Sequence, residues 1–475
     1  NYKFQQADPE GNRFLPAPLN LNEYNTFNFS QNYENLDYRA KQLWTEQFNW
    51  FVNYANTFGK HDVNAMVVFE QAANGGEWIQ AKGEQPMANL DQMFNYSKDA
   101  ERRWGDAEEY TGGRLSWIGR FNYTFDQKYI AEFSFRYDGN TLFPDGHRWG
   151  FFPSVSAAWR LSEESFMENT TDWLSNLKLR ASYGTTGNDL DLSKDPIDKI
   201  TAFSYLQKYN TGGTYVFGSN LANTIVAGDT PNPTLTWATS TTYNGGLDFG
   251  FFNNRLSGTL DVFYRKEVDI LGPRTVTLPS TYGQALAPEN YAERSWRGGE
   301  LALTWVDKAA NGAIDYSAYV NLGFARDRWD VLDVSATYQE GGNLYALSPL
   351  GKADGILTGL IADHLLTDPA EVEALKAQGF KQYGRDPYLG GILYKDTRGD
   401  GYTEGPDGRI DGNDAYNLLS ENGTPRINYG FGGNIKWKGI TIDVHFQGVG
   451  KYDRFVGGVD GGFYQHGGAV RPYFP

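Results

Sequence analysis

The sequence predicts an all-β protein, a transmembrane antiparallel up-and-down β-barrel with long extracellular loops. Three observations lead to this prediction. Apolar and polar residues alternate with a period of two along many short segments, which is the pattern of strands with two different faces. Short turns and long loops follow one another strictly, and transmembrane barrels have short turns at one end and long loops at the other. Aromatic residues make up 16% of the chain and 55 residues are glycine, a bias typical of large β structures with aromatic belts.

The alternation is clearest in residues 114–138. In its first half the apolar positions are Leu115, Trp117, Phe121, Tyr123 and Phe125, and the intervening ones include Arg114, Ser116, Arg120, Asn122 and Thr124. The break at Asp126, Gln127 and Lys128 is short enough for a tight hairpin, after which the alternation resumes. A strongly aromatic face opposite one with arginine and carboxylate groups fits a sheet between lipid and a watery lumen.

About twelve such runs are expected to be strands. They cover residues 42–58, 62–71, 114–125, 129–138, 155–161, 177–183, 243–251, 256–265, 301–305, 316–324, 427–437 and 440–446. Several are close to the ~9–11 residues that a tilted strand needs to cross a bilayer. The segments 72–113, 184–238 and 326–425 are expected to be long loops, the last with a surface helix over 369–378.

Composition excludes several other classes of protein. The 475 residues exceed the usual limit of a single globular core, so several domains or one very large sheet are expected. The net charge of −16 argues against nucleic acid as a partner. There is no cysteine, so neither a disulfide scaffold nor a thiolate metal site can form. No run approaches the ~18 apolar residues of a membrane helix, which barrel strands do not need.

Several segments resemble a known family when read in order. They include GRLSWIGRFNYTFDQKYIAEFSFRYDGNTLF, WGFFPSVSAAWRLSEESFM, LSNLKLRASYGTTGN, LSGTLDVFYRKEVDIL and INYGFGGNIKWKGITIDVHFQGVG. This series resembles the SusC-like branch of the TonB-dependent outer-membrane transporters of Bacteroidetes. The resemblance implies a 22-stranded barrel with an N-terminal plug. It also implies import powered through TonB and a SusD-like lipoprotein that closes the extracellular mouth as a lid.

The chain departs from that family pattern at both ends. No plug, TonB-contacting segment or carboxypeptidase-like extension precedes Asn1, and the chain stops at Pro475, before the family's last strands. An open sheet of about twelve strands in a membrane would leave unpaired edges. We therefore expect residues 1–475 to be an internal part of the transmembrane β-barrel domain, with the plug domain and the last barrel strands outside this chain.

The resulting functional hypothesis is an active importer in the bacterial outer membrane. The protein would capture a bulky nutrient, a glycan or an oligopeptide, and pass it through a gated pore without any catalytic residue. The expected partners are the SusD-like lipoprotein, TonB through segments absent from this chain, and outer-membrane lipid. The alternatives are a passive porin and a barrel adhesin or enzyme with a constricted lumen.

One loop has the beginnings of a cation site. Residues 396–401 resemble the start of an EF-hand loop, which spaces oxygen ligands at alternate positions and needs glycine for a sharp turn. The pattern resumes only after an insertion, and the side-chain ligands would be Asp396, Asp400, Asp411 and Asp414. Arg398 occupies a position where a cation site needs Asp or Asn. The hypothesis is a structural Ca²⁺ that stiffens the loop, the alternative is an Asp/Gly-rich surface turn, and no other cofactor is expected.

Two further sets of residues are candidates for function. Trp78, Trp104, Trp149 and Trp329 lie in or beside the expected long loops, where their rings could stack on sugars. The alternative for them is an interfacial girdle or ordinary packing. The charges expected to face the lumen are Arg114, Arg120, Glu132, Arg136, Asp138, Arg180, Asp248, Asp261 and Arg265. We interpret these mainly as salt-linked rings that hydrate the interior or hold a plug, and the alternative is direct contact with the substrate.

Overall fold

The structure is a computed structural model that describes residues 6–7, 14–15, 35–84, 103–191, 198–199, 203–218, 220–275 and 279–454. The chain divides into two compact units. One comprises residues 1–46 and 73–111, and the other residues 47–72 and 112–475. None of the described helices is long and apolar enough to cross a membrane.

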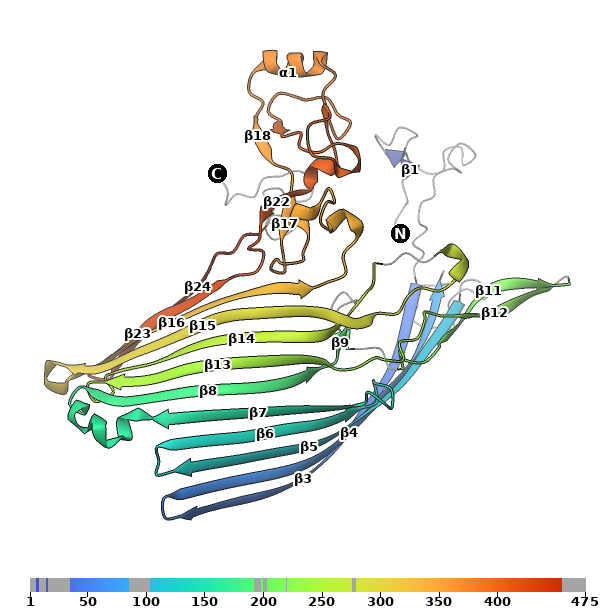
Figure 1. The fold of residues 1–475 in the computed structure, drawn as a ribbon. Coiled ribbons are helices and arrows are strands. Elements are labelled where there is room, and N and C mark those ends of the chain that lie inside the picture. The colour runs from blue at the N-terminus through green and yellow to red at the C-terminus, as the bar shows by residue number, and fades with distance from the viewer. Residues whose placement is uncertain are drawn as a thin grey trace. The chain divides into compact units, whose positions relative to one another are not determined.

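Twelve long strands of the described chain pair in sequence order (Figure 1). They are β3 (Asn35–Phe58), β4 (His61–Glu84), β5 (Arg103–Phe125), β6 (Tyr129–Asn140), β7 (Trp149–Arg160), β8 (Leu174–Asn188), β13 (Ala238–Phe251), β14 (Leu256–Gly272), β15 (Glu289–Ala309), β16 (Ile314–Val331), β23 (Ile427–Trp437) and β24 (Ile440–Gly450). From β5 to β24 every neighbouring pair is antiparallel. The up-and-down topology and the expected number of strands are confirmed.

Shorter elements occupy the connections between these strands. The strands are β1 (Gln6–Ala7), β2 (Phe14–Leu15), β9 (Leu190–Asp191), β10 (Asp198–Lys199), β11 (Tyr209–Phe217), β12 (Asn220–Ala227), β17 (Leu357–Gly359), β18 (Ala362–Leu365), β19 (Lys381–Gln382), β20 (Ile392–Tyr394), β21 (Arg409–Ile410) and β22 (Asn417–Ser420). The 3-10 helices span Leu161–Glu163, Ser165–Thr170, Ser280–Tyr282, Ala310–Gly312, Ala336–Tyr338, Tyr345–Leu347, Asp400–Tyr402 and Asn413–Ala415. The expected surface helix is confirmed as α1 (Pro369–Ala377), which begins after a hydrogen bond from the Ala370 amide to the Asp368 carboxylate (2.8 Å).

The short turns have the backbone that tight hairpins require. Asp126 and Gln127, between β5 and β6, have φ of 53° and 57°, and Asn253 and Asn254, between β13 and β14, have φ of 55° and 60°. Positive φ at consecutive turn residues matches the right-handed twist of the paired strands, and Asn and Asp tolerate it better than most residues. The turns expected at these positions are confirmed.

Two of the expected long loops contain more strand than the sequence indicated. β4 continues to Glu84 and β5 begins at Arg103, so both ends of the loop expected over 72–113 are strand, and residues 85–102 lie outside the described residues. The segment 184–238 contains the antiparallel hairpin β11–β12. Both predictions were wrong because these segments carry no sustained alternation of apolar and polar residues.

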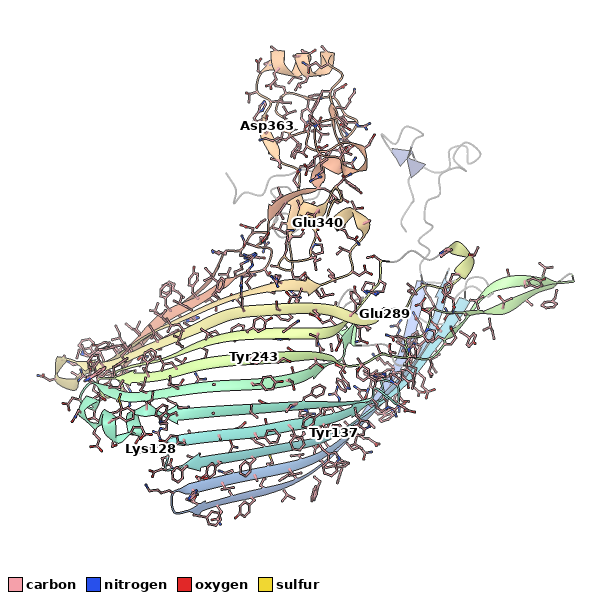
Figure 2. All side chains as sticks on the ribbon, in the orientation of Figure 1. Lys128, Tyr137, Tyr243, Glu289, Glu340 and Asp363 are labelled. Carbon is pink, nitrogen blue, oxygen red and sulfur yellow. The ribbon has the colours of Figure 1, made fainter. Side chains whose placement is uncertain are left out.

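The two faces of the large sheet differ in what covers them. Apolar side chains on one face, here called the apolar face, stay open: Phe121 is 45% exposed, Phe133 41% and Val262 57%. Tyr137 and Tyr243, which Figure 2 labels, belong to the same face. No second layer of described protein packs on these three side chains. The opposite, polar face carries Arg120, Arg180 and Asp261. The faces expected from the alternation are confirmed.

Compact cores form at the ends of strands, away from the apolar face. One cluster joins Phe143, Phe152, Leu235, Trp237 and Leu271, where the long connections leave the sheet. The loop after β16 buries its own apolar side chains, which include Leu344, Leu347, Leu366, Val372 and Ile410. These cores stabilise the long connections themselves.

Candidate functional site

An ion-pair network crosses three strands on the polar face. The Arg180 guanidinium on β8 lies 2.8 Å from an Asp248 oxygen on β13 and 2.9 Å from an Asp261 oxygen on β14. Gly246 lies between Arg180 and Asp261 in the strand register. A Cβ at Gly246 would approach both the Arg180 guanidinium carbon and an Asp261 oxygen to 2.7 Å. Glycine at this position is therefore what lets the two charged groups meet across the middle strand.

The other charges expected to face the lumen are paired as well. Arg120 lies 2.7 Å from Glu132, and Arg136 lies 2.9 Å from Asp138 and 3.7 Å from Glu70. Two further pairs join Arg114 to Asp189 (3.1 Å) and Arg265 to Glu267 (3.4 Å). The pairing shows that these residues are salt-linked. That they form rings that hydrate the interior or hold a plug stays a prediction.

Beside the Arg180 network the polar face has a hollow of about 450 Å³ between β14 and β24. Its polar lining includes Thr259, Asp261, Glu300, Asn321, Asn428, His445 and Gln447. Asp261 and Glu300 are direct cross-strand partners, so two carboxylates lie side by side. The hollow offers several hydrogen-bond donors and acceptors to a polar solute, and the sequence reasoning did not identify it.

At the long-loop end of the polar face, arginine and tryptophan side chains alternate across strands. The Arg265 guanidinium carbon lies 4.6 Å from the centroid of the Trp296 ring. The Arg294 carbon lies 5.0 Å from that centroid and 4.9 Å from the centroid of Trp329. Two Arg294 nitrogens also donate to Asp327 at 3.0 and 2.5 Å. Each guanidinium is thereby fixed by stacking and by charge, which favours recognition of a planar anionic or polar group.

The tryptophans proposed to bind sugar lie in different surroundings. Trp329 belongs to the stack above and is only 8% exposed. Trp149 is 42% exposed, stacks on Tyr137 at 4.8 Å between ring centroids, and lies on the apolar face, the position expected of a girdle residue. Trp78, in the other unit, is half-buried under the Arg39 guanidinium at 4.6 Å. Trp104 is part of β5, but its side chain lies outside the described residues. Sugar stacking at these residues stays a prediction.

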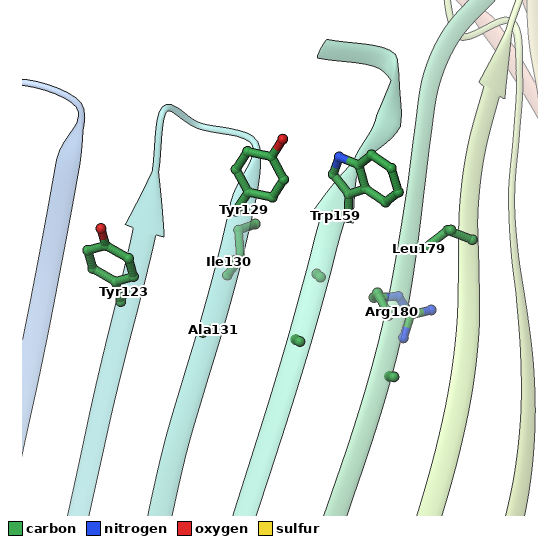
Figure 3. Close-up of a pocket in the computed structure, with 10 residues that line it drawn as sticks. Tyr123, Tyr129, Ile130, Ala131, Trp159, Leu179 and Arg180 are labelled. Carbon is green, nitrogen blue, oxygen red and sulfur yellow. The ribbon is translucent and has the colours of Figure 1, made fainter. Parts of the chain in front are cut away.

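Aromatic residues line the apolar face near the short turns. A shallow hollow of about 730 Å³ lies there over β5 to β8, bordered by Tyr123, Tyr129, Trp159 and Leu179 (Figure 3). The Glu164 carboxylate, in the turn after β7, accepts hydrogen bonds from the Tyr129 hydroxyl (2.6 Å) and the Trp159 indole N–H (2.9 Å). These two bonds lower the pKa of Glu164. Such residues mark the boundary between hydrocarbon and water in transmembrane barrels.

In the loop after β16, two of the four proposed Ca²⁺ ligands come together and two do not. Carboxylate oxygens of Asp400, Asp407 and Asp411 lie within 4.8 Å of one another. Asp396 instead accepts the backbone N–H groups of Asp407 and Gly408, at 3.1 and 2.7 Å. Asp414, which is fully buried, accepts the amides of Thr397, Arg398 and Asp411 at 2.7 to 3.0 Å.

Two arginines take positions that a cation would otherwise occupy in this loop. The Arg409 guanidinium lies 2.9 Å from Asp400, 3.0 Å from Asp407 and 3.7 Å from Asp411. Its hydrogen bond to Asp407 raises the pKa of Arg409. Arg398 is 6% exposed and donates to the carbonyl oxygens of Asn343, Tyr402 and Tyr416 at 2.8 to 3.0 Å. Arg398 therefore gathers loop carbonyls, which explains its presence where an EF-hand has a ligand.

The geometry of the polar face is suited to binding and passage. Comparison with known protein families shows that residues 2–469 match the family described as "TonB dependent receptor-like, beta-barrel". The chain belongs to this family. It is 28% identical to TonB-dependent receptor P26 of Formosa agariphila, over 72% of this chain and 32% of that protein. It is 30% identical to TonB-dependent receptor SusC of Bacteroides thetaiotaomicron, over 56% of this chain and 26% of that protein.

Solved structures give the same fold. The RagAB peptide importer in its closed-closed state matches with a TM-score of 0.66 and 21% identity, over 88% of this chain and 42% of that one. The chain thus spans about a third or less of the curated relatives named above. The SusC-like resemblance, the barrel fold class and the outer-membrane location are confirmed by these matches. The family is one of receptors and transporters and not a class of enzyme.

Proposed function

We propose that this chain forms part of an energy-coupled outer-membrane importer of a bulky nutrient, a glycan or an oligopeptide. The observation that carries the proposal is the two-faced sheet of a TonB-dependent receptor-like chain. Within the described part of the chain, its apolar face is left open at Phe121, Phe133 and Val262, and its polar face has charges paired across strands. Paired charges keep a lumen wet without binding a passing solute tightly, as passage requires.

Uptake by cells tests this proposal. Cells that express the whole protein, and a deletion strain, receive fluorescent oligosaccharides and oligopeptides of increasing size. We expect uptake only with the protein present, and we expect it to collapse when the inner-membrane proton gradient is abolished. Uptake that persists without the gradient would favour the passive porin. Surface binding without uptake would favour the adhesin.

A SusD-like lipoprotein lid is the partner that we propose for the extracellular side. The β11–β12 hairpin supports a protein contact, because large apolar side chains stand open on it: Tyr215 (59%), Phe217 (70%) and Ile225 (72%). The hairpin belongs to the long connection between β8 and β13, at the end of the strands that faces outward if the long loops are extracellular. Exposed apolar clusters rimmed by polar residues commonly mark protein contacts.

Co-purification tests the lid. The double variant Phe217→Asp/Ile225→Asp should retain less of the lipoprotein after detergent extraction than the wild type. The matched control is Leu389→Asp, a 55% exposed apolar residue in the loop after β16. Equal retention by all three proteins would remove the hairpin from the interface.

For the loop after β16 we propose a Ca²⁺ site whose ligands are Asp400, Asp407 and Asp411. The cation would bind there once Arg409 moves aside. Its role would be to stiffen the loop. Titration of CaCl₂ into the wild type, Arg409→Gln and Arg409→Gln/Asp411→Asn tests it, with protease resistance of the loop as the measurement. We expect Arg409→Gln to gain the largest Ca²⁺-dependent protection and the double variant to lose it. Protection that is equal in all three proteins would contradict these ligands.

A further inference from the structure

Apolar rows on the outward face of β14, β15 and β16 change abruptly to basic ones at the long-loop end. Cross-strand partners share a face of a sheet. Each row has one residue from β14, one from β15 and one from β16. From the middle of the strands toward the long loops, the rows are Leu260–Leu301–Leu322, Val262–Gly299–Phe324, Tyr264–Arg297–Arg326 and Lys266–Ser295–Arg328. Two arginines thus follow Phe324 on the same face of one strand, and a third faces them from the next strand. All three belong to the face that meets lipid.

We propose that these rows bind the phosphate-bearing headgroup of a lipid in the outer leaflet. A cavity of about 260 Å³ lies here, lined by Tyr264, Ser295, Trp296, Arg297, Arg326, Asp327, Arg328 and Gly351. The Asp327 carboxylate is itself paired with Arg294 on the polar face. A loop residue, Gly351, closes one side of it. The volume is sufficient for a phosphate group and the adjoining sugar or glycerol atoms.

Arg297 is the central donor of this site. Its side chain is exposed and has no ion-pair or hydrogen-bond partner in the part of the chain that the structure describes. Directly opposite it across the strands lies Arg326. Like charges in cross-strand register are destabilising unless an anion lies between them. A phosphate shared by the two guanidinium groups would relieve this repulsion and accept bidentate hydrogen bonds.

The remaining cations each have one carboxylate partner and still keep donors free. Arg326 uses one terminal nitrogen on Glu421 (3.0 Å), and Arg328 uses two nitrogens on Asp330. Lys266 pairs with Glu293 at 2.7 Å. Because a guanidinium has five N–H donors, Arg326 and Arg328 can still bind an anion. The partners also fix the arginines in place, which lowers the entropy lost on binding.

Position along the strands identifies the ligand as a lipid headgroup. From Leu256, after the short turn, to Tyr264 the strand has nine residues, close to the ~9–11 with which a tilted strand crosses a bilayer. The basic rows therefore lie where hydrocarbon ends and headgroups begin. The chain has a net charge of −16, so an exposed, unpaired arginine beside two others on this face is unlike the general surface.

Lipid binding to the whole protein, purified from its outer membrane in mild detergent and then delipidated, tests the proposal. Native mass spectrometry measures binding of phosphorylated lipid A, of the same lipid A after removal of its phosphates, and of inorganic phosphate. We expect the wild type to bind phosphorylated lipid A and Arg297→Gln/Arg326→Gln to bind it at least about tenfold more weakly. The dephosphorylated lipid should bind both proteins equally weakly.

The matched control is Arg255→Gln, an exposed arginine at the opposite end of β14, which should bind like the wild type. Equal binding by the wild type and the double variant, or of both lipids by the wild type, would overturn the proposal. So would inorganic phosphate that binds as tightly as the lipid, since the ligand would then be the free anion. Loss of a SusD-like partner from the double variant with lipid binding intact would instead assign the arginines to a protein interface.

If the double variant does not insert, Arg297→Lys keeps the charge while it removes the bidentate geometry. It should retain the preference for phosphorylated over dephosphorylated lipid A with weaker binding. Absence of that preference in both Arg297→Lys and the wild type would equally overturn the proposal. Nutrient uptake is a separate measurement, so failure here would leave the transport proposal standing.

Discussion

The two faces of the sheet share one backbone, but their side chains have different surroundings. On the polar face Arg180, Asp248 and Asp261 satisfy one another across three strands. On the apolar face Leu260 and Val262 remain 42% and 57% exposed, and none of the residues that the structure describes packs over them. The difference teaches that contacts within the protein stabilise the side chains of the polar face. The side chains of the apolar face depend instead on an apolar solvent around them.

Adjacent glycines show the same contrast within two residues of β13. A Cβ at Gly246, on the polar face, would collide with Arg180 and Asp261 at 2.7 Å. A Cβ at Gly245, on the apolar face, would meet only a Val262 methyl group at 3.8 Å, which is an ordinary contact. At the first position a methyl group would displace the ends of the two charged side chains, whereas at the second it has room.

The largest expected effect comes from moving a charge to the apolar face. Leu260→Arg should lower the free energy of unfolding in lipid vesicles by about 2–4 kcal/mol, because the charge enters hydrocarbon. Thr259→Arg should be nearly neutral, since Thr259 borders the polar hollow beside Asp261. Denaturant titration followed by tryptophan fluorescence measures both. Equal tolerance at the two positions would contradict the assigned faces.

The adjacent glycines provide the next test. Gly246→Ala should cost about 1–2 kcal/mol, because the new methyl group separates Arg180 from Asp261 and breaks charge-assisted hydrogen bonds. Gly245→Ala should be neutral or slightly stabilising, since alanine loses less backbone entropy on folding. The same denaturant titration compares the two variants, and a Gly246→Ala protein as stable as Gly245→Ala would show that the network contributes little.

Salt should affect only the polar face. The side chains of Arg180 and Asp261 are 29% and 21% exposed, so added ions screen their attraction. Raising NaCl from about 0.05 M to about 0.5 M should lower the stability of the wild type by less than about 1 kcal/mol. The variant Arg180→Met should show a smaller dependence, while Val262→Ala should keep that of the wild type. A matching salt response in Arg180→Met would refute this account.

The smallest effect concerns the aromatic boundary of the apolar face. Because hydrogen bonds from Tyr129 and Trp159 lower the pKa of Glu164, its ionised form contributes stability above the ordinary glutamate range. That contribution is lost as the pH falls through the lowered pKa. The wild type should therefore be more stable than Glu164→Gln at pH 7, and the difference should shrink as the pH falls through the ordinary glutamate range and vanish below the lowered pKa. Thermal unfolding measures it, with Glu168→Gln in the same turn as the control.

Much of the sheet could be predicted because period-two alternation is a local signal. The expected strand 427–437 matches β23, and the hairpin at Asp126–Lys128 was located from its residues alone. The extensions of β4 and β5 and the hairpin β11–β12 could not be predicted, since their residues carry no such alternation. Of the proposed site residues, Asp400 and Asp411 come together, whereas Trp329 is buried beneath Arg294.

The sequence by itself determined which side chains share a face, because alternation along a strand needs no knowledge of neighbours. Only the tertiary structure decided which groups meet across strands, because register joins residues as distant as Arg180 and Asp261. It also placed Arg297 opposite Arg326 and Arg409 among three carboxylates. The physical reason is separation along the chain. The pleat of a strand decides on which face neighbouring residues lie, whereas hydrogen-bond register and loop closure decide which residues meet when they are far apart in the chain.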